Sequence, residues 1–382
     1  MKIYNKQNVY DAAIDRIRYL FDEFENVVVG FSGGKDSTVT FQLALKIAKE
    51  KNRLPLSVIF IDQEAEWDSA ISYIRNIMSM PEVNPLWFQV PIQLFNATSS
   101  LSPWLYCWEQ DKKWMRDKEE ISIKTNTYGT DRFKHLFDKI IVSEFKNEKT
   151  CLLGGVRCEE SPQRLVGLTA ALTYKEITYG KKIDRKHFIF YPLYDWSYKD
   201  IWKTIYDNNY EYCSLYDDMY RYGVALNNMR VSNLHHETAV YSLFFLQEIE
   251  PDTWEKLTNR LDGINTAGMF GKDDFFAKKL PLPEMFSGWA EYRDYLVENL
   301  VPDEKIRKVY IKKFSQLDNR YAGISNLEIL YRVQIQTILC NDFEFTKING
   351  FECGKPAVAY RKHLAGKPAD IIKGKSYNSM IK

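Results

Sequence analysis

Apolar residues along the chain are grouped in two ways, as short continuous runs and as positions that recur every three or four residues. Short runs are typical of buried strands, and the recurring positions are typical of helices that pack on one face. Strand-like runs cover residues 27–31, 54–61, 86–90, 150–153 and 188–192, and helical patterns cover 8–24, 38–48, 68–78, 133–145 and 197–205. This alternation predicts an α/β fold with a doubly wound, mostly parallel sheet.

The later part of the chain has a different pattern. Beyond about residue 232 the strand-like runs stop, and helical patterns cover 235–246, 289–300, 305–314 and 327–339. We therefore predict one domain built on the sheet over residues 1–232, followed by a mainly helical domain over residues 233–382.

Composition places few limits on function. The chain has 382 residues, 45% hydrophobic and 27% charged, which is ordinary for a globular protein with room for two domains. The net charge of +1 gives no global reason to expect a nucleic-acid or membrane partner. No apolar run approaches a membrane span and no secretory leader is present, so we expect a cytoplasmic protein. The 6 cysteines contain no C-x-x-C pair, which argues against a zinc ribbon or a disulfide framework.

The loop between the first predicted strand and the next helix carries the strongest chemical signal. Residues 32–37 read Ser-Gly-Gly-Lys-Asp-Ser. Gly33 and Gly34 lack a Cβ, so their backbone N–H groups can approach an anion, and the N-terminus of the following helix adds a partial positive charge. The backbone of this 32–37 loop is therefore predicted to hold phosphate.

The side chains of the 32–37 loop suit the same ligand. Lys35 supplies a cation, and Ser32 and Ser37 supply hydroxyl groups for phosphate oxygens. Asp36 can hold Mg²⁺ and also suits the start of a helix. We expect a phosphate cradle with a magnesium site at Asp36.

Spacing separates this loop from two other phosphate-binding patterns. A Walker A loop ending at Lys35 would need glycine at position 29 and serine or threonine at position 36, where the chain has Val29 and Asp36. The dinucleotide pattern G-x-G-x-x-G is absent too, since no glycine follows Gly34 until Gly129. The hexapeptide instead resembles the PP-loop of the ATP pyrophosphatase superfamily, which includes phosphoadenosine phosphosulfate (PAPS) reductases, ATP sulfurylase small subunits and tRNA thiolation enzymes. This resemblance implies an adenine nucleotide alpha-hydrolase-like fold that binds ATP.

A second glycine turn follows the strand predicted at 150–153. Residues 154–164 read Gly-Gly-Val-Arg-Cys-Glu-Glu-Ser-Pro-Gln-Arg, similar to the glycine, arginine, glutamate-serine and arginine series of PAPS reductase-like proteins. Arg157 and Arg164 can bind phosphate or sulfate oxygens bidentately, and Glu160 can hold one of the guanidinium groups. The alternative is an internal arginine–glutamate ion pair at the start of a helix. We expect four residues of this turn to contact a nucleotide: Gly154, Gly155, Glu160 and Ser161.

Acidic residues follow the second predicted strand. Asp62 and Glu64 stand at its carboxyl end, where ligands of open α/β sheets bind. In PP-loop enzymes this segment borders the adenine and ribose, and the resemblance implies that role here. The alternative is that these carboxylates only complement the dipole of the next helix.

Three tryptophans, Trp104, Trp108 and Trp114, gather in a segment of mixed periodicity. They are suited either to stack on a base or second substrate, or to form an aromatic plug within the fold. We assign them no catalytic role.

The motifs together make the chain similar to PAPS reductase-like proteins with a C-terminal extension, of the immunoglobulin-binding regulator type. A third similarity supports this, the pattern P-L-x-D-W-x-x-x-D-[IV]-W at 192–202. For this type the resemblance implies a ParB-like protein partner. The tail from Lys355 carries seven basic residues against Asp370 alone, so it either binds a polyanion such as nucleic acid or is simply solvated.

Three functions are consistent with these motifs. The first is cleavage of ATP between its α and β phosphates to adenylate an acceptor, a nucleic-acid base or a small molecule, with the candidate catalytic residues Lys35, Asp36, Arg157 and Arg164. The second is thiol-dependent reduction of a sulfonucleotide by Cys353, whose E-C-G context resembles that of PAPS reductases although Pro356 replaces the family's histidine. The third is a non-catalytic nucleotide sensor that acts with a protein partner.

Overall fold

The structure, a computed structural model, describes residues 6–96, 98, 104–226, 229–231, 233–236, 242–261, 264, 281–301, 303–322, 327–339, 342, 345 and 348. The chain forms two compact units. The first unit comprises Met1–Leu94 and Trp104–Leu261, and the second unit comprises Phe95–Pro103 and Asp262–Lys382.

A six-stranded sheet forms the centre of the first unit. Its strands are β1 (Asn26–Gly30), β2 (Leu56–Ile61), β3 (Val83–Phe88), β6 (Thr150–Leu153), β7 (Gly180–Lys182) and β8 (His187–Phe190). The order is β3-β2-β1-β6-β8-β7, and every pair is parallel except β7 with β8. This confirms the predicted doubly wound, mostly parallel sheet. Two short strands that the pattern did not reveal, β4 (Ile92–Phe95) and β5 (Trp104–Cys107), pair separately.

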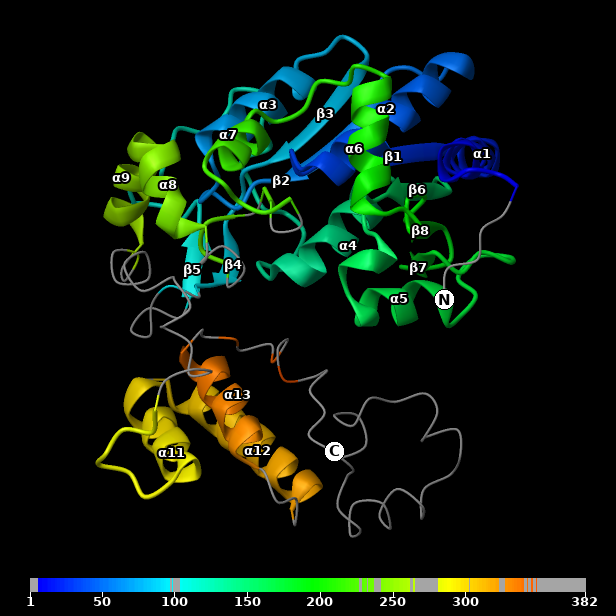
Figure 1. The fold of residues 1–382 in the computed structure, drawn as a ribbon. Coiled ribbons are helices and arrows are strands. Elements are labelled where there is room, and N and C mark those ends of the chain that lie inside the picture. Colours follow the sequence, from blue (N-terminus) through cyan, green and yellow to red (C-terminus); the bar gives the residue numbers. More distant parts are fainter. Residues whose placement is uncertain are drawn as a thin grey trace. The chain divides into compact units, whose positions relative to one another are not determined.

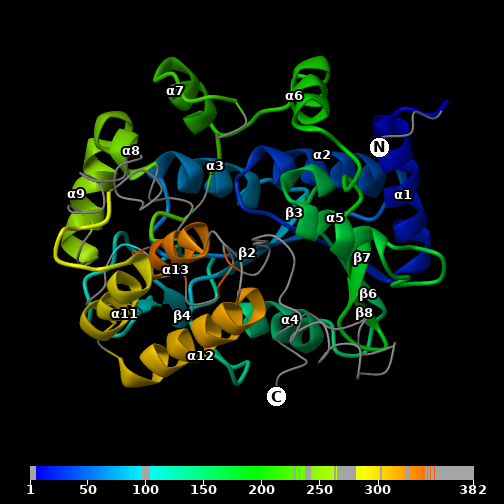
Figure 2. The ribbon, with the colours of Figure 1, turned by 60° about the horizontal axis from the view of Figure 1, so that its bottom comes forward.

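Helices cover both faces of this sheet. They are α1 (Val9–Glu23), α2 (Lys35–Glu50), α3 (Asp68–Met78), α4 (Phe133–Glu144), α5 (Pro162–Thr169), α6 (Tyr198–Asp207) and α7 (Leu215–Arg221). In Figure 1, and in Figure 2 after a turn of 60°, α2 and α3 lie on one side of the strands and α4 lies on the other. The chain proceeds from β1 to β3 in one direction and then returns to place β6 on the other side of β1.

The reversal of strand order at β1 positions the candidate site. β1 pairs with β2 on one side and with β6 on the other, so the carboxyl ends of β1 and β6 lie next to each other. In open α/β sheets the ligand crevice forms at such a reversal. The segments that leave these two strands are the 32–37 loop and the turn that starts at Gly154.

The first unit extends past residue 232, the predicted domain boundary, and includes α8 (Leu243–Ile249) and α9 (Pro251–Arg260). Glu250, between these helices, accepts hydrogen bonds from the backbone N–H groups of Asp68 and Ser69 at 2.8 and 3.1 Å. A carboxylate there satisfies N–H groups that α3 leaves unpaired and complements its dipole. Local patterns carry no sign of this contact, which joins residues 182 positions apart.

The helix predicted at 235–246 starts later than expected. Residues 234–236 form a turn, in which the Leu234 N–H donates to the carbonyl oxygen of Ala65 at 2.7 Å. The helical prediction for His235 and His236 is therefore wrong, because this tertiary contact overrides the local pattern. α8 begins at Leu243.

The described part of the second unit contains α11 (Trp289–Leu300), α12 (Glu304–Tyr321) and α13 (Glu328–Leu339), which confirms a mainly helical C-terminal region. Its buried cluster includes Tyr310, Phe314 and Ile335. In the same unit Arg293 Nη1 donates to Asp318 and to Gln334, each at 2.7 Å. Among the helices of the described residues, none is long and apolar enough to cross a membrane.

Candidate functional site

The 32–37 loop joins β1 to α2 through a turn that requires glycine at position 33. Gly33 has a φ of +72°, in the left-handed region that favours glycine. A Cβ at this position would also lie 3.2 Å from the side chain of Ile74. α2 then begins at Lys35, and Gly34 as its N-cap offers no side chain to the first N–H groups of the helix.

Several backbone N–H groups of this loop remain open. The Ser32 N–H donates to Ser37 Oγ at 3.2 Å, and the Lys35 N–H donates to the hydroxyl of Tyr216 at 2.9 Å. Over the described ranges, no acceptor is found for the backbone N–H groups of Gly33, Gly34, Asp36 and Ser37. Unpaired N–H groups at a helix N-terminus attract anions, so the loop has the geometry of an anion cradle.

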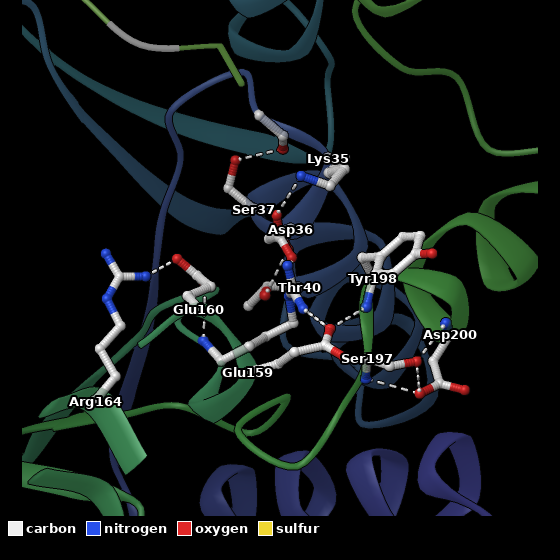
Figure 3. A network of polar contacts seen from close by, with 12 residues as sticks. Lys35, Asp36, Ser37, Thr40, Glu159, Glu160, Arg164, Ser197, Tyr198 and Asp200 are labelled. Carbon is white, nitrogen blue, oxygen red and sulfur yellow. Dashed lines mark hydrogen bonds and ion pairs between the residues drawn. The ribbon is translucent and has the colours of Figure 1, made fainter. Parts of the chain in front are cut away.

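Asp36 lies between two cations. One of its carboxylate oxygens pairs with Arg157 Nε, and the other lies 3.2 Å from Lys35 Nζ; Figure 3 shows the Asp36 side chain close to Lys35. The side chains of Arg157 and Lys35 are only 5% and 8% exposed, so salt screens these interactions weakly. Arg157 is also held by Glu159, whose Oε2 accepts from Nη1 at 2.9 Å. The arginine therefore fixes Asp36 beside the cradle.

The turn after β6 packs directly against the first turn of α2. A Cβ on Gly155 would lie 2.8 Å from the carbonyl carbon of Asp36 and 2.9 Å from the nitrogen of Ser37. A Cβ on Gly154 would lie 2.8 Å from the ring of Tyr191. These two glycines thus allow a close approach between protein segments, and that approach brings Arg157 to Asp36.

Glu160 holds both arginines of the second turn. Its Oε2 pairs with Arg164 Nη1, as Figure 3 shows, and its Oε1 accepts a hydrogen bond from the Arg157 N–H at 3.0 Å. Ser161 caps α5, because its Oγ accepts from the Arg164 N–H at 3.2 Å. The internal arginine–glutamate pair therefore forms, and it positions Arg164 at the start of a helix.

Arg164 lies close to a further arginine, Arg230. The Arg164 side chain is 43% exposed. Burial, and next the positive charge of Arg230, lower the pKa of Arg164, while Asp36 acts in the opposite direction. The positive charge of both arginines attracts oxyanions such as phosphate or sulfate.

Asp62 and Glu64 lie completely buried at the end of β2. Arg116 Nη2 pairs with Asp62 Oδ2 at 2.6 Å, and Arg260 Nε of α9 pairs with Glu64 Oε1 at 2.6 Å. The Trp108 N–H donates to Glu64 Oε2 at 2.7 Å. These carboxylates connect three segments of the first unit. Their contact with a nucleotide, implied by the resemblance, stays a prediction.

The tryptophan segment packs inside the first unit. Trp108 is 1% exposed, and its Nε1 donates to the carbonyl oxygen of Asp62 at 2.8 Å. Trp114 lies edge-on to it, with ring centroids 5.7 Å apart. For Trp108 the structure favours the aromatic plug over stacking on a ligand, because the ring is covered by protein.

Glu66 is a further buried carboxyl group near the end of β2, 7% exposed. Burial, and next the negative charge of Asp62, raise the pKa of Glu66 to about 8, against the opposing effects of Arg116 and the Gln63 N–H. Glu66 therefore carries a proton at neutral pH.

Asp36 is the carboxylate of the cradle that suits Mg²⁺. In nucleotide sites Mg²⁺ takes one or two protein carboxylates, and phosphates and waters supply its other ligands. The side chain of Asp36 is 21% exposed beside the open N–H groups, which fits that pattern. Within the described part of the chain, no group of three or more histidine, cysteine, aspartate or glutamate residues could hold a metal ion.

Two predicted features, Cys353 and the basic tail from Lys355, lie outside the described residues. The described cysteines are free thiols: Cys107, Cys151, Cys158 and Cys213.

Two family models match adjacent parts of the chain. The phosphoadenosine phosphosulfate reductase domain matches residues 26–222, which is more than half of the chain and contains both glycine turns. A domain of unknown function, DUF3440, matches residues 223–350.

Similar proteins include one relative that covers most of this chain. The uncharacterized protein YbdN of Escherichia coli (strain K12) is 29% identical, over 81% of this chain and 79% of that protein. A probable FAD synthase of Schizosaccharomyces pombe is 26% identical, over 57% of this chain and 67% of that protein. Sulfate adenylyltransferase subunit 2 of Psychromonas ingrahamii is 25% identical, over 53% of this chain and 64% of that protein.

The close approach at Gly155 leads to a first prediction. We expect Gly155→Ala to destabilise the fold by about 1–3 kcal/mol, because the added Cβ must displace the first turn of α2. Gly167→Ala on α5 is the matched control, since a Cβ there meets nothing within 4 Å, and it should leave stability unchanged or slightly raised. Urea unfolding followed by tryptophan fluorescence measures both. Equal stability of the two variants would contradict the packing described.

The buried proton of Glu66 leads to a second prediction. The pKa of Glu66 is about 8 in the folded chain against an ordinary value of 4.5, so between these values only the folded state holds the proton. The contribution of this group to stability is therefore lost as the pH rises, by at most about 1.4 kcal/mol per pH unit. Glu66→Gln removes the titration, and its stability relative to wild type should rise from about pH 5 to pH 8.

Urea unfolding across this pH range measures the difference for Glu66→Gln. Glu120→Gln, at an exposed position of the same unit, is the control. A wild-type-minus-variant difference that stays constant over the range is the outcome that would rule out a buried, protonated Glu66.

Proposed function

Because the chain belongs to the phosphoadenosine phosphosulfate reductase domain family, we propose that it binds ATP in the 32–37 loop and cleaves it between the α and β phosphates to adenylate an acceptor. One observation carries this proposal, the open backbone N–H groups at the N-terminus of α2 beside the ammonium group of Lys35. Several donors and a cation around one point suit a polyanionic group such as pyrophosphate. A sulfate adenylyltransferase subunit among the relatives supports this class of reaction.

In the proposed reaction an oxygen of the acceptor attacks the α-phosphorus of ATP. The bond from the acceptor oxygen to phosphorus forms, the bond from the α-phosphorus to the bridging oxygen breaks, and pyrophosphate leaves with the electron pair. The acceptor proton passes to water. Negative charge grows on the pyrophosphate, where the N–H groups of the 32–37 loop and Lys35 stabilise it without rearranging. Bound Mg²⁺, held by Asp36 and phosphate oxygens, would neutralise part of the same charge.

The two arginines have different tasks in this proposal. Arg157 is buried and paired with Asp36 and Glu159, so it acts as a positioning residue. Arg164 is more exposed and lies near Arg230, so it binds an anionic part of the nucleotide or of the acceptor.

The adenylated acceptor, a nucleic-acid base or a small molecule, would then be substituted. Reduction of a sulfonucleotide by Cys353 is the alternative suggested by the name of the matching family. Sulfite release from PAPS with thioredoxin, lost in Cys353→Ser, would favour this reductase. A non-catalytic nucleotide sensor would bind ATP but would release no pyrophosphate with any acceptor.

Replacing Lys35 tests the proposed cradle. We expect Lys35→Ala to bind Mg-ATP at least about tenfold more weakly, since a charged hydrogen bond is worth about 1.5–3 kcal/mol, and to release no pyrophosphate. Calorimetry measures the binding, and a coupled pyrophosphate assay with cell extract as the source of acceptor measures the turnover. Lys46→Ala, exposed on the same helix, is the matched control. Wild-type protein that binds neither ATP nor pyrophosphate would refute the proposal.

We further propose that the tail from Lys355 binds nucleic acid and that the chain acts with a ParB-like protein, which a co-purification experiment can test. Binding through the tail should release counterions, so the affinity for a DNA duplex should fall steeply between about 50 and 200 mM salt. Removing residues 355–382 should eliminate that dependence in a fluorescence anisotropy titration. An affinity that does not change with salt would argue against a role for the tail.

A further inference from the structure

Tyr216 reaches the 32–37 loop from a distant part of the chain. It lies on α7 and is 3% exposed. Its hydroxyl oxygen accepts a hydrogen bond from the Lys35 N–H at 2.9 Å. A Cβ on Gly34 would lie 3.6 Å from this oxygen. The hydroxyl group thus stands at the edge of the anion cradle.

The packing around Tyr216 holds its ring in one place. Trp202 of α6 lies edge-on to the ring, with centroids 5.2 Å apart and planes at 86°. On the same helix Leu215 and Met219 are buried, at 0% and 1% exposure. The ammonium group of Lys35 lies 5.6 Å from the centre of the ring. A ligand therefore meets the hydroxyl as a fixed part of the cradle wall.

The hydrogen bonds of this hydroxyl leave its own proton available. A phenolic hydroxyl can both accept and donate a hydrogen bond, and here the Lys35 N–H donates to its oxygen. No acceptor for the hydroxyl proton of Tyr216 is found among the residues that the structure describes. Burial raises the pKa of Tyr216 above its usual range, so the proton stays in place at neutral pH.

We infer that the Tyr216 hydroxyl donates a hydrogen bond to an oxygen of the pyrophosphate group bound in the 32–37 loop. This inference rests on the proposed function, since it takes a pyrophosphate-containing nucleotide as the ligand. The hydroxyl of Tyr216, on α7, would thus add a side-chain donor to the open backbone N–H donors of the 32–37 loop.

Calorimetry with inorganic pyrophosphate and Mg²⁺ tests the inference. We expect Tyr216→Phe to weaken binding by about tenfold or more, because a hydrogen bond to a charged oxygen is lost while the ring remains. Tyr220→Phe, on the same helix with a 67% exposed ring, is the matched control and should bind as wild type does. Thermal unfolding without ligand shows whether each variant keeps its fold.

A second substitution separates a donor from a structural contact. A ring-fluorinated tyrosine at position 216 keeps the ring and the oxygen but makes the hydroxyl a stronger hydrogen-bond donor. Pyrophosphate should then bind as tightly as in wild type or more tightly, opposite in direction to the phenylalanine variant.

Each outcome decides between the two proposals. Wild-type affinity in a folded Tyr216→Phe variant overturns the inference and leaves the proposed function standing. Tighter binding by that variant also overturns it, since the hydroxyl would then compete with the ligand for the Lys35 N–H. If wild-type protein binds neither ATP nor pyrophosphate, both the proposed function and the inference fail, and if it binds ATP but not pyrophosphate, only the inference fails.

Discussion

The candidate site depends on the contact between two pieces of backbone, the turn at Gly155 and the first turn of α2. The gap between them is too small for a Cβ, as the 2.8 Å distance from that position to the Asp36 carbonyl carbon shows. Because the turn lies there, Arg157 reaches Asp36 and Glu160 reaches the Arg157 N–H. Parallel pairing of β1 with β6 brings the two segments together. The sheet thus sets the distances on which the electrostatics of the site depend.

The charges at this site alternate in sign. Asp36 lies between Lys35 and Arg157. Glu160 pairs with Arg164 and accepts a hydrogen bond from the Arg157 N–H. Taking such charges out of water is costly, and pairing offsets only part of that cost. The pairs therefore contribute more to orientation than to stability. The hydrogen-bond donors of the cradle are already oriented before an anion binds. Binding therefore does not include the free-energy cost of ordering them.

Local sequence patterns predicted the parts of the site that are local in the chain. The 32–37 loop and the turn at 154–164 could be recognised because glycine spacing, an adjacent strand and a following helix lie within a few residues of each other. Tyr216 could not be found in this way, since 181 positions separate it from Lys35 and an isolated tyrosine carries no periodic signal. The ion pairs of Asp62 and Glu64 could not be found locally for a similar reason, because their partners Arg116 and Arg260 are far along the chain.

The ion pair between Glu64 and Arg260 has a consequence for the evolution of this chain. Glu64 lies in the segment that matches the reductase family, whereas Arg260 lies in the segment that matches the second family model. A gene that lost or exchanged the second segment would encode a buried carboxylate without its counter-ion, a defect of about 3–5 kcal/mol. That penalty is comparable with the whole stability of many domains. Recombination at the border between the two segments is therefore disfavoured, and we expect selection to keep them in one reading frame.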